Sequence, residues 1–159
     1  MALTVFSLIL WLTIFCFSLL PKKLSLLENS FVFFVLSVVI MNSFTIASLN
    51  LKWIESNKET VMFLVYILYR AIIYPVALLF LTNLIFMYET FSTKLVGAIL
   101  VPIFILLVEI SGEKLNVYTY KQWNNWYSIT EIILFSLITL LITKFIRSLK
   151  QRMYQHESI

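Results

Sequence analysis

The sequence reads TVMFLVYILYRAIIYPVALLFLTNLIFM over residues 60–87, an apolar run that contains a single charged residue, Arg70. A helix needs about 20 apolar residues to cross the hydrocarbon core of a bilayer. Arg70 lies about 10 residues, or about 15 Å of helix, from the start of this run. A charge at that depth costs about 2.5–3.5 kcal/mol on insertion scales. The run therefore predicts a membrane-spanning helix in which the Arg70 guanidinium needs a partner.

The composition of the whole chain agrees with a membrane protein. Its 159 residues are 61% hydrophobic and 13% charged, and the mean hydropathy is +0.94. These values lie far outside the range of soluble domains. Further apolar stretches cover residues 2–20, 30–49, 93–111 and 126–144. The sequence therefore predicts an all-α, polytopic bundle of five transmembrane helices over residues 1–145, followed by a basic tail over residues 146–159.

Several kinds of chemistry find no support in the residues. The single cysteine, Cys16, cannot form an internal disulfide, and together with the single histidine, His156, it offers no metal-binding set. The chain has no Asp, no HExxH, no glycine-rich phosphate loop and no Ser/His/Asp set. We therefore expect no enzymatic activity, no cofactor and no metal.

The distribution of basic residues predicts the orientation in the cell membrane. The first stretch lacks a basic start and a cleavage site, so it is expected to be a retained anchor. If the tail is cytoplasmic, five crossings place the N-terminus outside. The positive-inside bias favours this orientation, because the inner side then holds Lys22, Lys23, Lys94, Lys144, Arg147, Lys150 and Arg152, and the outer side only Lys52, Lys58, Lys114 and Lys121.

The distribution of basic residues also indicates which partners to expect. The net charge of +4 is carried by short loops and by the tail, so nucleic acid is not expected. The predicted partners are the lipid bilayer, anionic lipid at the basic tail, and either a second copy of the chain or another membrane protein.

Polar side chains within the third stretch form a stripe. Tyr66, Arg70 and Tyr74 recur at four-residue spacing and so share one helix face. Pro75 has no N–H and leaves the carbonyl of Ala71 without its helical donor, which predicts a kink just after the arginine. In the second stretch, Asn42 and Thr45 are three residues apart, and their common face is expected to contact another helix.

Two carboxyl groups are expected near Arg70. The predicted topology places Glu109 and Glu131 in the outer half of the membrane, at depths similar to that of Arg70. An arginine can be held there by charge-assisted hydrogen bonds to carboxylates. Three interpretations stay open, namely a structural clamp, a site for a polar or anionic ligand, and proton transfer through the glutamates. The candidate polar cluster is Arg70, Glu109, Glu131, Tyr66, Tyr74 and Asn42.

Motifs in the second half resemble a known group of proteins. The third stretch contains Tyr74-Pro75, and the fourth ends with Glu109 before Gly112. An aromatic loop follows, in which residues 117–120 are locally extended in character. The loop leads to WNNWYS at residues 123–128. This layout resembles a group of small uncharacterised multi-pass membrane proteins of spore-forming, low-GC Gram-positive bacteria. The resemblance implies a bacterial cytoplasmic membrane.

These observations favour a non-enzymatic accessory or assembly component of a membrane. The alternative is a small transporter or ligand-binding subunit in which Arg70 contacts an anionic or polar ligand. A membrane-embedded enzyme is the third hypothesis.

Overall fold

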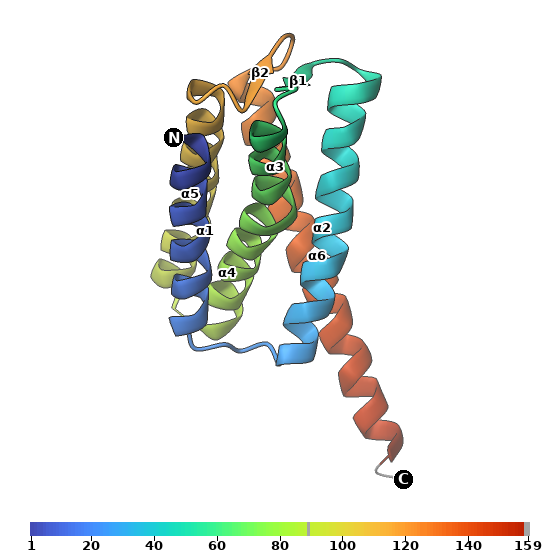
Figure 1. Ribbon diagram of the computed structural model, residues 1–159. Coiled ribbons are helices and arrows are strands. Elements are labelled where there is room, and N and C mark those ends of the chain that lie inside the picture. Colours follow the sequence, from blue (N-terminus) through green and yellow to red (C-terminus); the bar gives the residue numbers. More distant parts are fainter. Residues whose placement is uncertain (89, 158–159) are drawn as a thin grey trace.

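The structure, a computed structural model, describes residues 1–88 and 90–157, with side chains described to residue 150. Within these ranges five helical segments are long and apolar enough to cross a membrane, which confirms the predicted helical class. The segments run side by side (Figure 1). The helices are α1 (Ala2–Leu19), α2 (Leu26–Thr45), α3 (Thr60–Leu68), α4 (Tyr74–Met87), α5 (Phe91–Lys114) and α6 (Asn125–Glu157). Two π-helical segments, η1 (Ile46–Asn50) and η2 (Tyr69–Ile73), extend α2 and join α3 to α4.

Two helix boundaries differ from the prediction by more than three residues. Helix α2 begins at Leu26 because Ser25 and Glu28 form a capping box, in which the Ser25 N–H donates to the Glu28 carboxylate (2.6 Å). Helix α6 continues through the predicted end of the membrane domain to Glu157. No glycine or proline follows residue 125 to stop it. The start of the predicted basic tail is therefore a continuation of the last helix.

The third candidate membrane span, α3–η2–α4, which we call the third span, is the centre of the molecule. About two-thirds of its most apolar window is buried, against one-third or less in each of the other candidate spans of the described chain. Helix α4 contacts α1, α2, α5 and α6. The apolar core around it includes Leu36, Ile40, Ile73, Leu78, Ile105 and Phe135.

The predicted disruption of the third span appears as η2, the π segment directly before Tyr74 and Pro75. The span changes direction between α3 and α4 (Figure 1). The carbonyl of Ala71, which proline deprives of its α-helical donor, accepts a hydrogen bond from the Ser37 hydroxyl of α2 (3.0 Å). The neighbouring helix thus satisfies the backbone group that Pro75 releases.

This contact gives a testable expectation for Ser37→Ala. Loss of one hydrogen bond to a partly buried carbonyl should lower the free energy of unfolding by about 1 kcal/mol. In a Pro75→Ala background the cost should be smaller, because alanine supplies the missing N–H. Thermal unfolding of the four variants of this cycle in one detergent measures the coupling, and equal costs in both backgrounds would contradict the assignment.

A small sheet closes one end of the bundle. Strand β1 (Ile54–Ser56) pairs antiparallel with β2 (Tyr118–Tyr120), with Ile54 opposite Tyr120. The extended character predicted for residues 117–120 is confirmed. The N-terminus lies near this end and the described C-terminal helix leaves at the other (Figure 1), which is the arrangement expected for an odd number of crossings.

Candidate functional site

The most deeply buried charge of the described chain is Arg70, which is only 2% exposed. Its guanidinium carbon lies 3.5 Å from the ring centroid of Phe44 in α2 and 3.5 Å from that of Tyr66 in α3. Tyr118 of β2 lies 6.0 Å away. Aromatic faces attract cations electrostatically, most strongly where water is excluded. We call Arg70, Phe44, Tyr66 and Tyr118 the Arg70 cage.

The predicted ion pair between Arg70 and a glutamate is not formed. Among residues 1–88 and 90–150, the ion pairs are Lys121–Glu55 (3.2 Å) and Lys150–Glu28 (3.6 Å). The expectation that carboxylates of Glu109 and Glu131 hold Arg70, and so tie the last three apolar stretches together, is therefore wrong. The physical reason is that a planar, weakly hydrated guanidinium stacks well on rings, so aromatic side chains can take the place of an acid.

Glu109 instead organises the contact between α5, β2 and α6. Its Oε1 accepts hydrogen bonds from the Tyr120 hydroxyl (2.5 Å) and the Ser128 hydroxyl (3.0 Å). Trp123 Nε1 donates to the same serine oxygen (2.9 Å), and the Tyr118 hydroxyl donates to the Glu109 backbone carbonyl (2.6 Å). We call these five residues the Glu109 cluster.

The two tyrosines of β2, Tyr118 and Tyr120, keep their hydroxyl protons and act as hydrogen-bond donors. Burial raises the pKa of Tyr118 well above its ordinary value, and the negative charge of Glu109 adds to the effect. Burial also raises the pKa of Tyr120, with further contributions from Tyr118 and Glu109. Both phenols therefore stay protonated at neutral pH and keep donating to Glu109.

The structure does not bring Asn42 into the candidate cluster. Asn42 and Thr45 are both exposed and donate to carbonyls one turn earlier, those of Val38 and Met41 (2.7 Å each). The predicted helix contact through this face is therefore wrong for the described chain. The physical reason is that a polar side chain can satisfy its donor on a carbonyl of its own helix.

Glu131 also stands apart from the bonded groups. It is half-buried on α6, and the hydrogen bonds and ion pairs of the described residues do not include it. Of the predicted set, the structure brings Arg70 and Tyr66 into direct contact and places Glu109 in the neighbouring cluster, to which Tyr118 also belongs.

Several buried polar atoms in and beside the Arg70 cage lack a hydrogen-bond partner within the described chain. They are Arg70 Nε and the hydroxyls of Tyr66, Tyr69 and Tyr74. The rings of Tyr69 and Tyr74 stack at a centroid distance of 5.8 Å. An unpaired buried polar atom costs about 1–3 kcal/mol. A small polar or anionic molecule that formed hydrogen bonds with these atoms would recover part of that cost.

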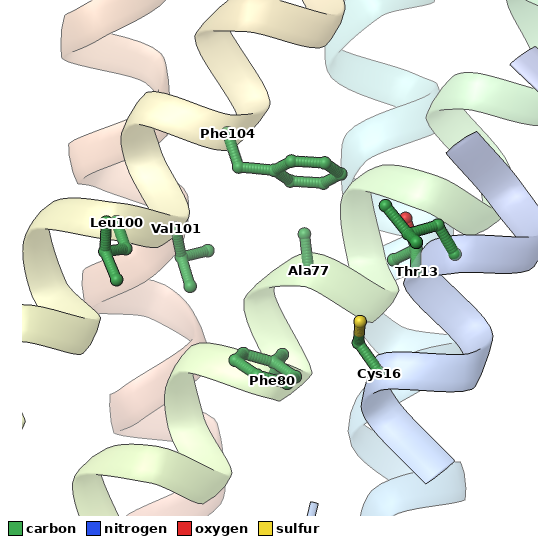
Figure 2. Close-up of a pocket in the computed structure, with 8 residues that line it drawn as sticks. Thr13, Cys16, Ala77, Phe80, Leu100, Val101 and Phe104 are labelled. Carbon is green, nitrogen blue, oxygen red and sulfur yellow. The ribbon is translucent and has the colours of Figure 1, made fainter. Parts of the chain in front are cut away.

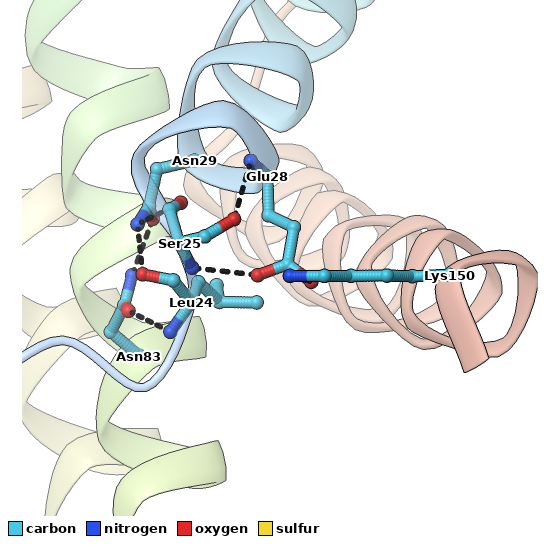
Figure 3. A network of polar contacts seen from close by, with 6 residues as sticks. All are labelled: Leu24, Ser25, Glu28, Asn29, Asn83 and Lys150. Atoms are coloured by element: carbon cyan, nitrogen blue, oxygen red, sulfur yellow. Dashed lines mark hydrogen bonds and ion pairs between the residues drawn. The ribbon is translucent and has the colours of Figure 1, made fainter. Parts of the chain in front are cut away.

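A second polar network, at the end of the bundle away from the sheet, was not predicted from the sequence. Asn83 donates to the Asn29 side chain (2.7 Å) and accepts from the Leu24 N–H (3.4 Å). Asn29 in turn donates to the carbonyls of Leu24 and Ser25 (Figure 3). Asn83 is fully buried. The signal for this network was an amide deep in an apolar run; nothing comparable marked Phe44, which is one of 14 phenylalanines.

An apolar crevice lies between α1, α4 and α5 and has a volume of about 210 Å³ (Figure 2). The Thr13 hydroxyl at its edge already donates to the Ile9 carbonyl (2.6 Å). The crevice thus offers apolar contact to a lipid chain or a neighbouring side chain. Its lining consists of Leu12, Thr13, Cys16, Ala77, Phe80, Leu100, Val101 and Phe104.

Comparisons with known proteins place the chain in no group. No family model, curated protein or solved structure matches it.

Proposed function

We propose that the protein is a five-span protein of the bacterial cytoplasmic membrane, with its N-terminus outside, and that it works as a non-enzymatic accessory or assembly component. Five helices of sufficient length and hydropathy in the described chain support the membrane placement. Lys22 lies at the same end as Lys150, as five crossings require.

The enclosure of Arg70 is the observation that carries the proposal. The guanidinium carbon lies over two aromatic rings, each at 3.5 Å from the centroid, and the residue is 2% exposed. A group that binds a ligand through its charge needs an open approach, whereas a group that holds helices together does not. The carboxylate of Glu109 likewise faces donors of β2 and α6. The buried charges of the outer end thus support a structural role.

The outward surface supports contact with other membrane components. Large apolar side chains are exposed on α1, α5 and α6, among them Leu8, Leu100, Leu107 and Leu141. In a bilayer these faces meet lipid tails or the helices of a partner. An accessory subunit needs such a lateral surface.

Photo-crosslinking in the native membrane tests the accessory role. A photoreactive residue replaces Leu100 or Leu141, both exposed, and a control carries it at Ile105, which is 1% exposed. We expect a discrete polypeptide adduct, of a second copy or of another membrane protein, from an outward position and none from Ile105. Lipid adducts alone from both outward positions would overturn the accessory role.

The second candidate function is ligand binding at the edge of the Arg70 cage. The unpartnered Arg70 Nε and the hydroxyls of Tyr69 and Tyr74 favour it. A thermal-shift screen of the purified chain with small anions tests it. A stabilisation that Tyr74→Phe abolishes without changing the unliganded melting temperature would favour this function over the structural role.

A further inference from the structure

A basic pocket lies where the connection between α1 and α2 meets the last part of α6. Its volume is about 390 Å³, within the range of small-molecule sites. Lys22 and Lys23 come from the connection, and Arg147 and Lys150 come from α6. Leu24, Ser25 and Glu28 complete the lining. We call this the basic pocket.

The positive charge of the basic pocket is largely uncompensated. Its one carboxylate, Glu28, accepts from the Ser25 N–H and lies 3.6 Å from Lys150 Nζ. In the described part of the chain, no carboxylate pairs with the other three cations. Lys22 lies over the Phe17 ring at 5.0 Å and Arg147 over the Phe86 ring at 5.1 Å. Lys22 Nζ also donates to the Ser18 carbonyl (3.4 Å). These contacts position Lys22 and Arg147 without a paired carboxylate, so their charge is available to an anion.

The connection that carries the two lysines is held in place. Asn83 binds the Leu24 N–H, and Asn29 binds the carbonyls of Leu24 and Ser25 (Figure 3). On the other side, Lys150 reaches across to Glu28 from α6 (Figure 3). The pocket is therefore built from fixed elements, which lowers the entropic cost of binding.

An apolar crevice adjoins the basic pocket. The two share Lys22 and Leu24. The crevice has a volume of about 490 Å³ and lies between α1, α2 and α4, and its apolar lining includes Phe17, Phe33, Phe34 and Leu79. A cationic pocket at the end of the spans, beside an apolar crevice that shares Lys22 and Leu24 with it, matches the chemistry of a phospholipid, whose phosphate lies at the headgroup level and whose chain runs into the core.

We propose that the basic pocket binds the phosphate of an anionic phospholipid, with an acyl chain of the same molecule in the adjoining crevice. The phosphate oxygens accept from Lys22, Lys23, Arg147 and Lys150. This proposal rests on the membrane placement proposed above and is independent of the accessory role.

Native mass spectrometry of the full chain in detergent tests the site, with phosphatidylglycerol as the probe and phosphatidylcholine as the uncharged comparison. Lys22→Gln/Lys23→Gln should weaken phosphatidylglycerol binding about thirtyfold, since two basic residues are removed and each contributes separately to anion affinity. The matched control is Lys58→Gln/Lys114→Gln, which removes the same charge from exposed positions at the other end. It should leave the affinity unchanged.

Competition distinguishes a lipid from a free phosphate compound. Neither inorganic phosphate nor deacylated glycerophosphoglycerol should displace phosphatidylglycerol at equal concentration, because neither fills the crevice. Displacement by either would overturn the lipid assignment, as would equal binding of the two lipids or equal weakening in the control variant. Loss of the wild-type chain from carbonate-washed membranes would instead refute the membrane placement itself.

Discussion

Arg70→Ala is expected to lower the free energy of unfolding by about 3 kcal/mol, from the loss of desolvated cation–π contacts and of the packing of the side-chain stem. The guanidinium lies 3.5 Å from two rings that belong to different helices, Phe44 in α2 and Tyr66 in α3. Its removal leaves a hollow where α2, the third span and β2 meet. For a chain of this size the loss corresponds to about 6–12 °C in the melting temperature, which thermal unfolding in a mild detergent measures.

Two further variants separate stacking from charge. Arg70→Lys keeps the positive charge, yet it should be destabilised as well, because an ammonium group is strongly hydrated and lacks the planar face that stacks on rings. Phe44→Leu removes one ring, and its effect should be less than additive with Arg70→Ala, with a coupling of about 1 kcal/mol. Additive effects with Phe44, together with coupling between Arg70 and Glu109 or Glu131, would show that the charge is held by an acid.

The helices of this fold could be predicted from the sequence, because membrane-spanning length and hydropathy are local properties. The third apolar run, residues 60–87, coincides with the span Thr60–Met87. Pro75 also indicated where that span would be disrupted. Helix ends were harder to place, since the capping box at Ser25 extended α2 by a turn beyond its apolar run.

The partner of Arg70 could not be predicted in the same way. An acid is the obvious partner of a buried cation, and the chain offered two at suitable depth. The sequence also contains 14 Phe and 8 Tyr residues, and nothing local distinguishes Phe44 from the others. Glu109, in turn, accepts hydrogen bonds from residues 11 and 19 positions further along the chain. These contacts form only because β2 folds over the end of the bundle. Tertiary packing therefore determined both partners.

Gly112→Val is expected to destabilise the protein by about 3 kcal/mol, the upper part of the usual range for overpacking. A Cβ at this position would lie 2.7 Å from Cε1 of Tyr118 and 2.8 Å from its hydroxyl oxygen. Tyr118 must then move, which breaks its hydrogen bond to the Glu109 carbonyl (2.6 Å). It also withdraws the ring from Tyr66, 5.6 Å away between centroids. One small residue thus couples the Glu109 cluster to the Arg70 cage.

Gly112→Ala tests the same contact more clearly, because the expected change in stability is opposite in sign to the usual one. Replacing glycine by alanine within a helix normally stabilises it by about 0.5–1 kcal/mol, so a loss of stability at Gly112 must come from the contact with Tyr118. The matched control is Gly97→Ala in the same helix, where the tightest contact of the added Cβ is with the flexible end of Leu84, at 3.1 Å, and the next is an ordinary contact with the Leu84 Cβ at 3.5 Å. Thermal unfolding should show a clear loss for Gly112→Ala, little change for Gly97→Ala, and a smaller loss for Gly112→Ala in a Tyr118→Leu background. A stable Gly112→Ala variant, or a cost that Tyr118→Leu does not reduce, would mean that the end of the bundle that carries the sheet does not depend on the close approach of β2 to α5.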